Sequence, residues 1–208
     1  MRLKHKKSVV LIAIGALFLS FLLFSALPNG SKKGASTTES ILQESNNEQI
    51  NILVGKYFSA RQTGDLEIMS ELFTDPSAID KTKLNLLRNY IEEYKNIKCH
   101  LIENEKKDAY CVYVQYEIKL FNIVTPAPSL TVLYITQGSD GDYKIFNSPQ
   151  DESIRKFIEA SDKNIEIIKL KNRIEKEYEE VRKNDPDLNE FSNMLQQQTN
   201  AATGSAVE

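Results

Sequence analysis

Hydrophobic and polar positions divide this chain into a long apolar run, a polar stretch and a series of amphipathic segments. The apolar run covers the 20 uncharged positions from Ser8 to Leu27. At about 1.5 Å per residue, a helix of that length crosses a hydrocarbon core of roughly 30 Å. We therefore predict a transmembrane signal-anchor over residues 8–27.

A cleaved secretory signal is the alternative reading of the same run. Such signals have an apolar core of about 7 to 15 residues and end at a small-x-small site. Cleavage after Ala26 would need a small residue where Phe24 stands, so the anchor is favoured. Basic residues crowd positions 1–7, which predicts a cytoplasmic tail and places the rest of the chain outside the cell membrane.

Residues 28–47 form a linker between this apolar run and the amphipathic segments. They are rich in Gly, Ser, Thr and Asn, and they cannot bury enough apolar surface to offset the entropy of ordering. We therefore expect this linker to be flexible.

Three helices are predicted after the linker. The first has a stripe at helical spacing and ends at Gly64 as a C-cap; the stripe holds Ile52, Leu53, Lys56, Tyr57 and Ala60. Asp65 is expected to cap a short second helix, and Asp80 a third. The apolar positions of the third are Leu84, Leu87, Tyr90, Ile91 and Tyr94.

Strand-like spacing follows the helices. Alternating or continuous apolar runs predict four strands, over residues 97–102, 110–121, 130–136 and 143–146. The third of these is apolar on both faces, so we expect both to be covered. Pro126 and Pro128 are expected to interrupt the ladder, and Ser139 to Asp142 to form a tight turn. The fold class predicted is α+β, with three helices packed on a curved antiparallel sheet of about four strands.

Helical spacing returns over residues 148–195. A short amphipathic segment precedes a long helix, which Ser161 and Asp162 would cap and which ends at Asp185. A last short helix spans residues 188–195, and we predict disorder over 196–208. Sustained heptads are absent, which favours docking of these helices on the sheet over a coiled coil with a partner.

The segment VGKYFSARQTGDLEIMSELF resembles the opening helices of the nuclear transport factor 2-like superfamily, which packs helices on a conical, cystatin-like sheet. The stretch from YIEEYKNIKCHLIENE to TPAPSLTVLYI is similar to membrane-anchored extracytoplasmic proteins of clostridial bacteria. The resemblance covers residues 47–146 and implies a domain of this fold over 48–147. Enzymes and non-catalytic modules share that architecture, so the resemblance leaves activity open.

Composition and motif content argue against several classes of partner and reaction. The formal net charge is −3, and no Lys/Arg stripe follows Lys33, which argues against a nucleic-acid partner. The two histidines are His5 and His100, and no nucleophile triad, metal-ligand cluster or phosphate loop can be assembled. We therefore predict no catalytic residue, no metal site and no cofactor.

Tyrosine is the residue type that offers a binding surface. Several tyrosines are expected near the mouth of the cone, where a ring supplies apolar area and its hydroxyl a directional bond; they are Tyr57, Tyr90, Tyr94, Tyr113, Tyr116 and Tyr134. Packing in the core and sheet is the alternative, because tyrosine also suits a half-buried pleated surface.

Cys99 and Cys111 are candidates for a disulfide, because the compartment outside the membrane permits one. A hairpin that turns at Glu105 would place the two directly opposite each other on one face. A one-residue slip would send the thiols to opposite faces, so two unpaired thiols are the alternative.

The leading hypothesis for function is a non-catalytic extracytoplasmic module that binds a protein or envelope component and is held at the membrane by Ser8 to Leu27. One alternative is an inner-membrane scaffold subunit of a conjugation or type IV secretion channel, whose plan of tail, single span and outer domain resembles this one. A second alternative is an enzyme that acts on a small apolar substrate in the cone pocket.

Overall fold

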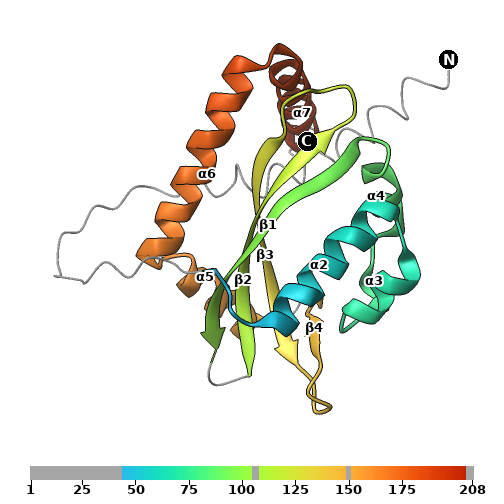
Figure 1. The fold of residues 1–208 in the computed structure, drawn as a ribbon, viewed down its shortest axis with the longest axis vertical. Coiled ribbons are helices and arrows are strands. Elements are labelled where there is room, and N and C mark those ends of the chain that lie inside the picture. Colours follow the sequence, from blue (N-terminus) through green and yellow to red (C-terminus); the bar gives the residue numbers. More distant parts are fainter. Residues whose placement is uncertain (1–43, 105–107, 149–150, 205–208) are drawn as a thin grey trace.

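Figure 1 shows the protein as a computed structural model, which describes residues 44–104, 108–148 and 151–204. The described chain is α+β, as predicted, with an open antiparallel sheet in the order β1-β2-β3-β4. The strands are β1 (Ile91–Asn104), β2 (Ala109–Leu120), β3 (Ala127–Gln137) and β4 (Tyr143–Ile145). The helices are α2 (Glu48–Thr63), α3 (Leu66–Leu72), α4 (Lys81–Leu87), α5 (Glu152–Ser161), α6 (Ile165–Asn184) and α7 (Pro186–Gly204), with a 3₁₀ turn, η1 (Pro76–Ala78).

The first helices begin and end at the predicted caps. Gly64 ends α2 in the left-handed conformation at φ 71°, and its N–H bonds the Ala60 carbonyl at 2.8 Å. The Asp65 carboxylate accepts two backbone N–H bonds, each 3.0 Å, at the start of α3. Asp80 does the same for α4 through the Lys83 N–H at 2.8 Å. These short polar residues therefore set the helix boundaries.

The predicted apolar stripe of α2 is rotated relative to the observed one. Ile52, which the prediction placed in the stripe, is 51% exposed. The buried face consists of Ile50, Leu53, Val54, Phe58, Ala60 and Arg61. It therefore includes Arg61, whereas the charged residue of the predicted stripe, Lys56, is exposed.

The third helix is shorter than predicted, because it ends at Leu87. Ile91 and Tyr94, two apolar positions of the predicted helix, lie in β1 and pair with Leu120 and Ile118 of β2. The segment satisfies both helical and strand spacing, and pairing along the full length of β2 selects the strand.

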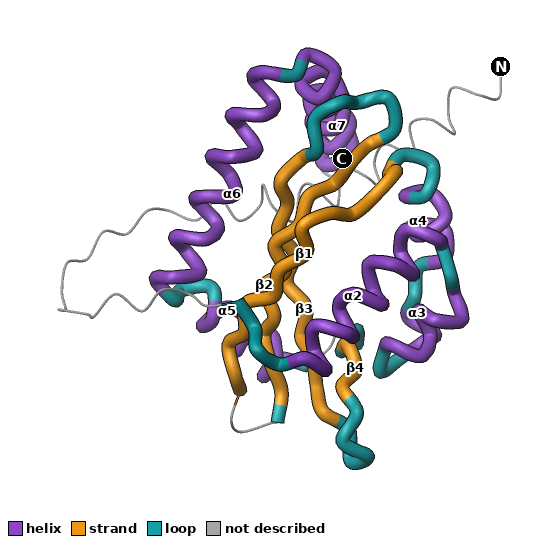
Figure 2. Tube along the Cα trace, in the orientation of Figure 1, coloured by secondary structure: helices purple, strands orange, loops and turns teal. Residues whose placement is uncertain are grey.

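β1 is bent by irregularities in its pairing with β2. Lys95 pairs with Glu117 and Lys98 with Gln115, so two residues of β1 stand opposite one of β2. Asn96, the first of the two, has a positive φ of 52°. Such a bulge bends a strand and increases its twist, which lets β1 curve around α2 (Figure 2).

β3 begins earlier than predicted, at Ala127, and includes Pro128. Pro128 is paired in register with Glu117 of β2, in a part of β3 that β4 does not reach. A proline lacks an N–H donor and is tolerated where a strand has one neighbour. Both faces of β3 are covered, as expected: Leu133 and Ile135 belong to one core, and Leu130 and Val132 pack on another.

The sheet carries helices on both faces (Figure 1). One face packs on α2 and α4, and the main core formed there also takes in Leu188, Phe191 and Leu195 of α7. The other face packs on α6 through Ile167, Leu170 and Ile174. The predicted docking of the C-terminal helices on the sheet is therefore confirmed.

Two predictions for the C-terminal region are wrong in detail. The cap of α6 is Asn164, whose side chain accepts the Glu166 N–H at 2.9 Å, instead of Ser161 and Asp162. The disorder predicted from residue 196 is replaced by helix as far as Gly204, because α7 continues without a break.

The predicted anchor, the basic tail and most of the linker lie outside the described residues. Among the helices that are described, none has the length and apolar content needed to span a bilayer.

Candidate functional site

A buried arginine surrounded by aromatic rings is the most unusual chemical feature of the main core. Arg61, in the last turn of α2, is only 5% exposed. Its guanidinium carbon lies 5.4 Å from the ring centre of Tyr57, 5.9 Å from Phe58 and 5.3 Å from Tyr94. Tyr116 closes the group, since its ring lies 4.6 Å from Phe58 and 5.9 Å from Tyr94. We call these five residues the Arg61 cage.

Three elements build the cage. Residues 57, 58 and 61 lie on one side of α2 because they are three and four positions apart in a helix. Tyr94 of β1 and Tyr116 of β2 reach the same place from the sheet, on the face that packs against α2. The bulge at Asn96 separates Tyr94 from the later residues of β1 and turns this part of the strand toward the helix.

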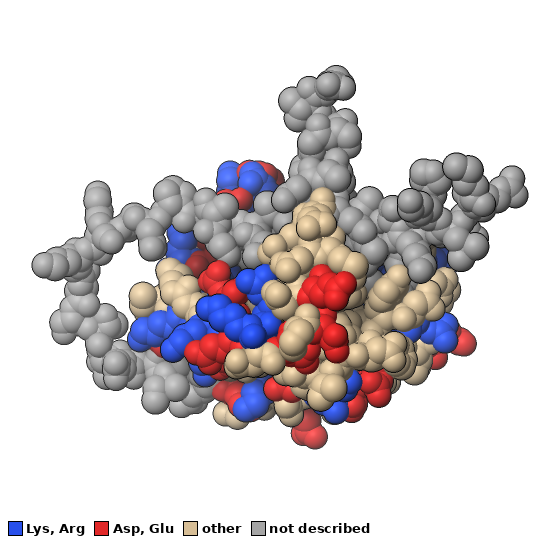
Figure 3. All heavy atoms as spheres, turned by 90° about the horizontal axis from the view of Figure 1, so that it is seen from above, with Lys and Arg blue, Asp and Glu red and all other residues tan. Residues whose placement is uncertain are grey.

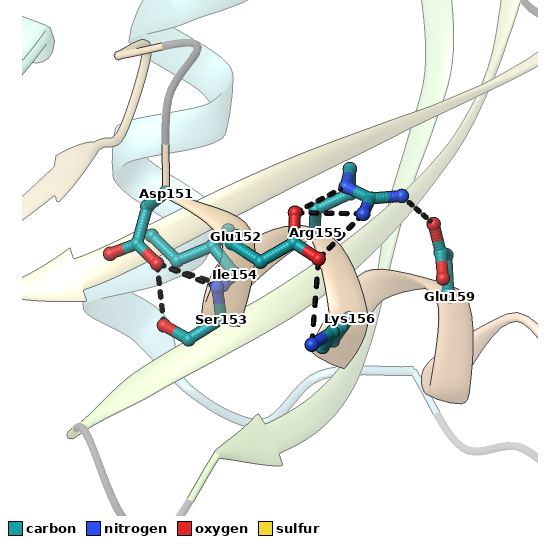
Figure 4. A network of polar contacts seen from close by, with 7 residues as sticks. All are labelled: Asp151, Glu152, Ser153, Ile154, Arg155, Lys156 and Glu159. Atoms are coloured by element: carbon teal, nitrogen blue, oxygen red, sulfur yellow. Dashed lines mark hydrogen bonds and ion pairs between the residues drawn. The ribbon is translucent and has the colours of Figure 1, made fainter.

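No carboxylate pairs with Arg61 within the described residues. Its Nη1 donates to the Tyr57 hydroxyl at 3.2 Å, and the Tyr94 and Tyr116 hydroxyls lie close enough to the same guanidinium that, against the larger effect of burial, it lowers their pKa. Arg155 of α5 is a contrasting case: its exposed guanidinium bonds Glu152 at 2.6 Å and Glu159 at 2.7 Å (Figure 4). The exposed Arg155 guanidinium is thus paired with two carboxylates, whereas the buried Arg61 guanidinium has no carboxylate beside it within the described residues.

Charged side chains elsewhere on the surface are mostly balanced. Lys and Arg lie beside Asp and Glu on the face shown in Figure 3. Pairs three or four residues apart, such as Lys169 with Glu166 and Arg182 with Glu179, account for this along α6. The unbalanced charge of the Arg61 cage is therefore a local feature and does not follow from a generally basic surface.

The cage keeps Arg61 charged and keeps Tyr94 and Tyr116 neutral. Burial alone lowers the pKa of Arg61. The surrounding tyrosine hydroxyls together raise it by more than burial lowers it, so the pKa of Arg61 lies above its ordinary value. Burial raises the pKa of Tyr94 and of Tyr116, against the opposing effect of Arg61. The hydroxyls therefore stay protonated at neutral pH, and the cage offers hydrogen bonds and one positive charge, with no base.

Burying this charge is costly for the fold. Removing an ion from water costs several kcal/mol even after relaxation. Each ring over the cation returns up to about 2 kcal/mol, and a hydrogen bond to a charged group about 1.5 to 3 kcal/mol. The three rings and the Tyr57 hydroxyl thus offset much of the penalty without an anion.

The six tyrosines predicted to line a cleft are divided between two faces of the sheet. Tyr57, Tyr94 and Tyr116 meet in the Arg61 cage. Tyr90 packs beside Phe191 of α7, with their ring centres 6.4 Å apart. Tyr113 and Tyr134 belong to the cores on the opposite face, against the C-terminal helices. The structure therefore brings three of the six together.

Tyr113 belongs to a second polar group, which ties the sheet to the loop between α5 and α6. Its hydroxyl donates to Asp162 at 2.7 Å, and Lys171 bonds the same carboxylate oxygen at 2.5 Å. The Lys171 ammonium also lies 5.5 Å from the Tyr113 ring centre. Here the Lys171 ammonium has the Asp162 carboxylate as its partner, so the charge of this group is balanced within the protein.

The possible disulfide between Cys99 and Cys111 does not form, and the alternative of two unpaired thiols is what the structure has. Cys99 pairs in register with Val114, and Cys111 with Ile102, so the two cysteines are not opposite each other. They lie in cores on opposite faces, and both are free thiols. The hairpin is centred between Asn104 and Ala109 instead of at Glu105, and this shift of register separates them.

Burial raises the pKa of Cys99 to about 11 and that of Cys111 to about 12, which makes both thiols poor nucleophiles.

An open groove of about 420 Å³ lies elsewhere, between α2, α3 and the β3–β4 turn. Its lining mixes acidic, basic and apolar side chains: Gln49, Ile52, Leu53, Lys56, Glu71, Leu72, Asp140, Asp142, Tyr143 and Lys144. None of these belongs to the Arg61 cage. Both signs of charge line the groove, so it shows no preference for one class of ligand.

Arg61 was not predicted as a site residue, although a signal for it exists. It lies four residues after Tyr57 and seven after Val54, on the apolar side of α2. The predicted stripe was rotated toward Ile52, so Arg61 fell outside it. The correct phase of the helix would have shown a charge on a buried face, which is an informative pattern.

Comparison with known proteins identifies no relative. No family model matches the chain, and no curated protein or solved structure matches it either. Among the described residues, no group of three His, Cys, Asp or Glu side chains is placed to hold a metal ion.

Proposed function

We propose that this protein is a non-catalytic, membrane-anchored binding module whose domain lies outside the cell membrane and belongs to the nuclear transport factor 2-like superfamily. The apolar run over residues 8–27 supports the anchor, and the basic residues before it support the orientation. The α+β fold, with helices against a curved antiparallel sheet, is consistent with that superfamily.

The observation that carries the proposal is the Arg61 cage. Within the described residues Arg61 is buried without a counter-ion, which is costly, and charged groups in such strongly perturbing surroundings cluster at functional sites. The Tyr94 and Tyr116 hydroxyls beside Arg61 are held neutral, so they are suited to holding a ligand rather than to removing a proton from one.

The anchor is tested by protease treatment of intact cells. We expect an epitope tag at the C-terminus to be digested, and a tag at the N-terminus to be protected. Membrane fractions should contain the full-length chain. A protected C-terminal tag, or a mature chain that begins after residue 27, would refute the anchored arrangement.

The binding role is tested by crosslinking in intact cells. Formaldehyde-treated cells would carry the full-length wild type, Arg61→Met or Arg155→Met, each captured through a C-terminal tag. Arg155 is the matched control because it is exposed and already paired with Glu152 and Glu159. We expect a crosslinked species from wild type and Arg155→Met that is lost from Arg61→Met. The same profile from all three proteins, each shown to be folded by circular dichroism, would contradict a binding role for the cage.

A further inference from the structure

The loop between β2 and β3, residues 121–126, carries exposed apolar side chains at one end of the sheet, beside α7 (Figure 1). Val124 is 81% exposed, more than any other large apolar side chain of the described residues, and Phe121 is 48% exposed. Ile123, which lies between them in the sequence, is buried in the main core. Because Ile123 occupies the interior position of the loop, the other two side chains present apolar surface to solvent.

Polar contacts fix this loop from both sides. The Lys119 ammonium donates to the backbone carbonyl of Ile123. The Thr125 N–H donates to the buried Asp185 carboxylate at 3.0 Å. Turning Val124 into the domain would break these contacts and displace Ile123 from the core. The exposure of Val124 is therefore a property of an ordered loop.

The tip of the loop carries no charge that would oppose its removal from water. The chain has no charged residue from Leu120 to Ser139. Lys119, at the base of the loop, forms an ion pair with Glu92 at 3.3 Å. Asp185 is only 8% exposed, and its carboxylate accepts backbone N–H groups. Moving the tip into an apolar medium would therefore bury no unpaired ion of the loop.

The size of the exposed apolar surface favours lipid over protein as its partner. A stable protein–protein interface buries about 800 Å² on each partner. One aromatic side chain supplies about 150 to 250 Å², so Phe121 and Val124 together fall well short of that area. A bilayer requires no complementary groove, and its binding strength scales with whatever apolar area is buried.

The predicted anchor would bring this loop and a bilayer together. Residues 28–47 connect the apolar run to α2. A flexible chain of about 20 residues has an average span of roughly 25 Å, so the domain would stay close to the membrane. A tether of this kind raises the effective concentration, and contacts too weak to hold a free protein become significant.

We propose that the loop over residues 121–126 is a membrane contact, which inserts Phe121 and Val124 into the interfacial region of the bilayer that holds the anchor. This contact rests on the anchor of the proposed function. It orients the domain, with the end of the sheet beside α7 toward the lipid.

Tryptophan fluorescence of the full-length protein, reconstituted in phosphatidylcholine vesicles, tests the proposal. The chain contains no tryptophan, so Val124→Trp places a single reporter on the loop. Lys156→Trp is the control, because Lys156 is an exposed position of α5. We expect emission from Val124→Trp at shorter wavelength, and quenching by brominated phosphatidylcholine about twofold or more above the control. Circular dichroism would show that both variants are folded.

A second substitution tests whether the apolar tip causes the insertion. Phe121→Asp, added to Val124→Trp, should lower the quenching to the level of the control, because a charge resists transfer out of water. Ile165→Asp is the matched change, since Ile165 is 58% exposed on α6, and it should leave the quenching of Val124→Trp unaltered. Equal quenching of both double variants would overturn the proposal.

Flotation of the vesicles tests the anchor separately. Chains that float with the vesicles while Val124→Trp is quenched no more than Lys156→Trp would overturn the loop contact and leave the anchored module intact. A shift to shorter wavelength that brominated lipid does not quench would place the loop against protein, which also overturns the contact with lipid. Chains that do not float would refute the anchor, and the loop contact with it.

Discussion

Two buried polar side chains are important for the stability and chemistry of this fold. Arg61 is one case, and Asp185 is another. Asp185 is buried between α6 and α7, where its carboxylate accepts the N–H groups of Asp187 and Leu188, each at 3.1 Å, and that of Thr125 at 3.0 Å. One side chain therefore caps α7 and fixes the loop between β2 and β3.

Stability should depend on pH through Asp185. Hydrogen bonds from Thr125 and Leu188 hold the pKa of its carboxyl below the ordinary value. A pKa that is lower in the folded state means that the ionised form stabilises the fold above the unfolded value of about 3.9, and that this stabilisation is lost as the pH falls through the folded value. Urea unfolding of the wild type and Asp185→Asn at pH 7 and pH 3 should show a difference that shrinks in acid. An equal difference at both pH values, with Glu190→Gln as the exposed control, would contradict this role.

At the residue scale, short-range rules predicted the caps of the first helices correctly, the cap of α6 incorrectly, and burial less well. Asp65 and Asp80 act through neighbours two or three positions away, and their roles were predicted correctly. The buried face of α2 depends on which side of the helix meets the sheet. A rotation of the predicted stripe was enough to hide Arg61 and to place Ile52 inside.

Elements depend on contacts that are distant in sequence, and β1 shows this most clearly. The segment from Ile91 to Tyr94 has a helical pattern, but it pairs with the far end of β2. The two irregularities in β1 then determine which residues face each other, and no local pattern encodes them. For this reason the number of strands and their antiparallel pairing could be predicted, while the register, and with it the fate of Cys99 and Cys111, could not.

Two glycines of α2 offer a matched test of how the helix ends. Gly64 has a φ of 71°, and a Cβ there would lie 2.3 Å from the Cδ of Arg88. Gly55 lies inside the helix, and a Cβ there meets nothing within 4 Å. We expect Gly64→Ala to lower the free energy of unfolding by about 1 to 2 kcal/mol and Gly55→Ala to raise it by about 0.5 to 1 kcal/mol. Urea unfolding gives both values, and effects of the same sign would contradict the capping role of Gly64.

At the scale of the whole molecule, the C-terminal helices are part of the domain. The main core unites residues of α2 and the sheet with Leu188, Phe191 and Leu195 of α7. The sequence predicted a boundary between residues 147 and 148, because the pattern changes there from strand to helix. Patterns of this kind mark elements, but a shared core becomes visible only in three dimensions.

Among the described residues, the same core contains a feature that works against stability, a buried cation without a counter-ion. If the Arg61 cage exists to bind a ligand, its arginine is retained for that purpose at a cost to the free fold. If it exists to hold α2 against the sheet, its removal should weaken the fold. These two readings make opposite predictions for the unliganded protein.

Urea unfolding of full-length Arg61→Met, followed by far-ultraviolet circular dichroism in detergent micelles without ligand, distinguishes them most directly. Methionine fills a similar volume and removes the charge. Our account predicts a free energy of unfolding within about 1 kcal/mol of the wild type, or above it. A loss of about 3 kcal/mol or more, the cost expected for removing one partner of an essential buried contact, would show that Arg61 holds the core together and would contradict the account.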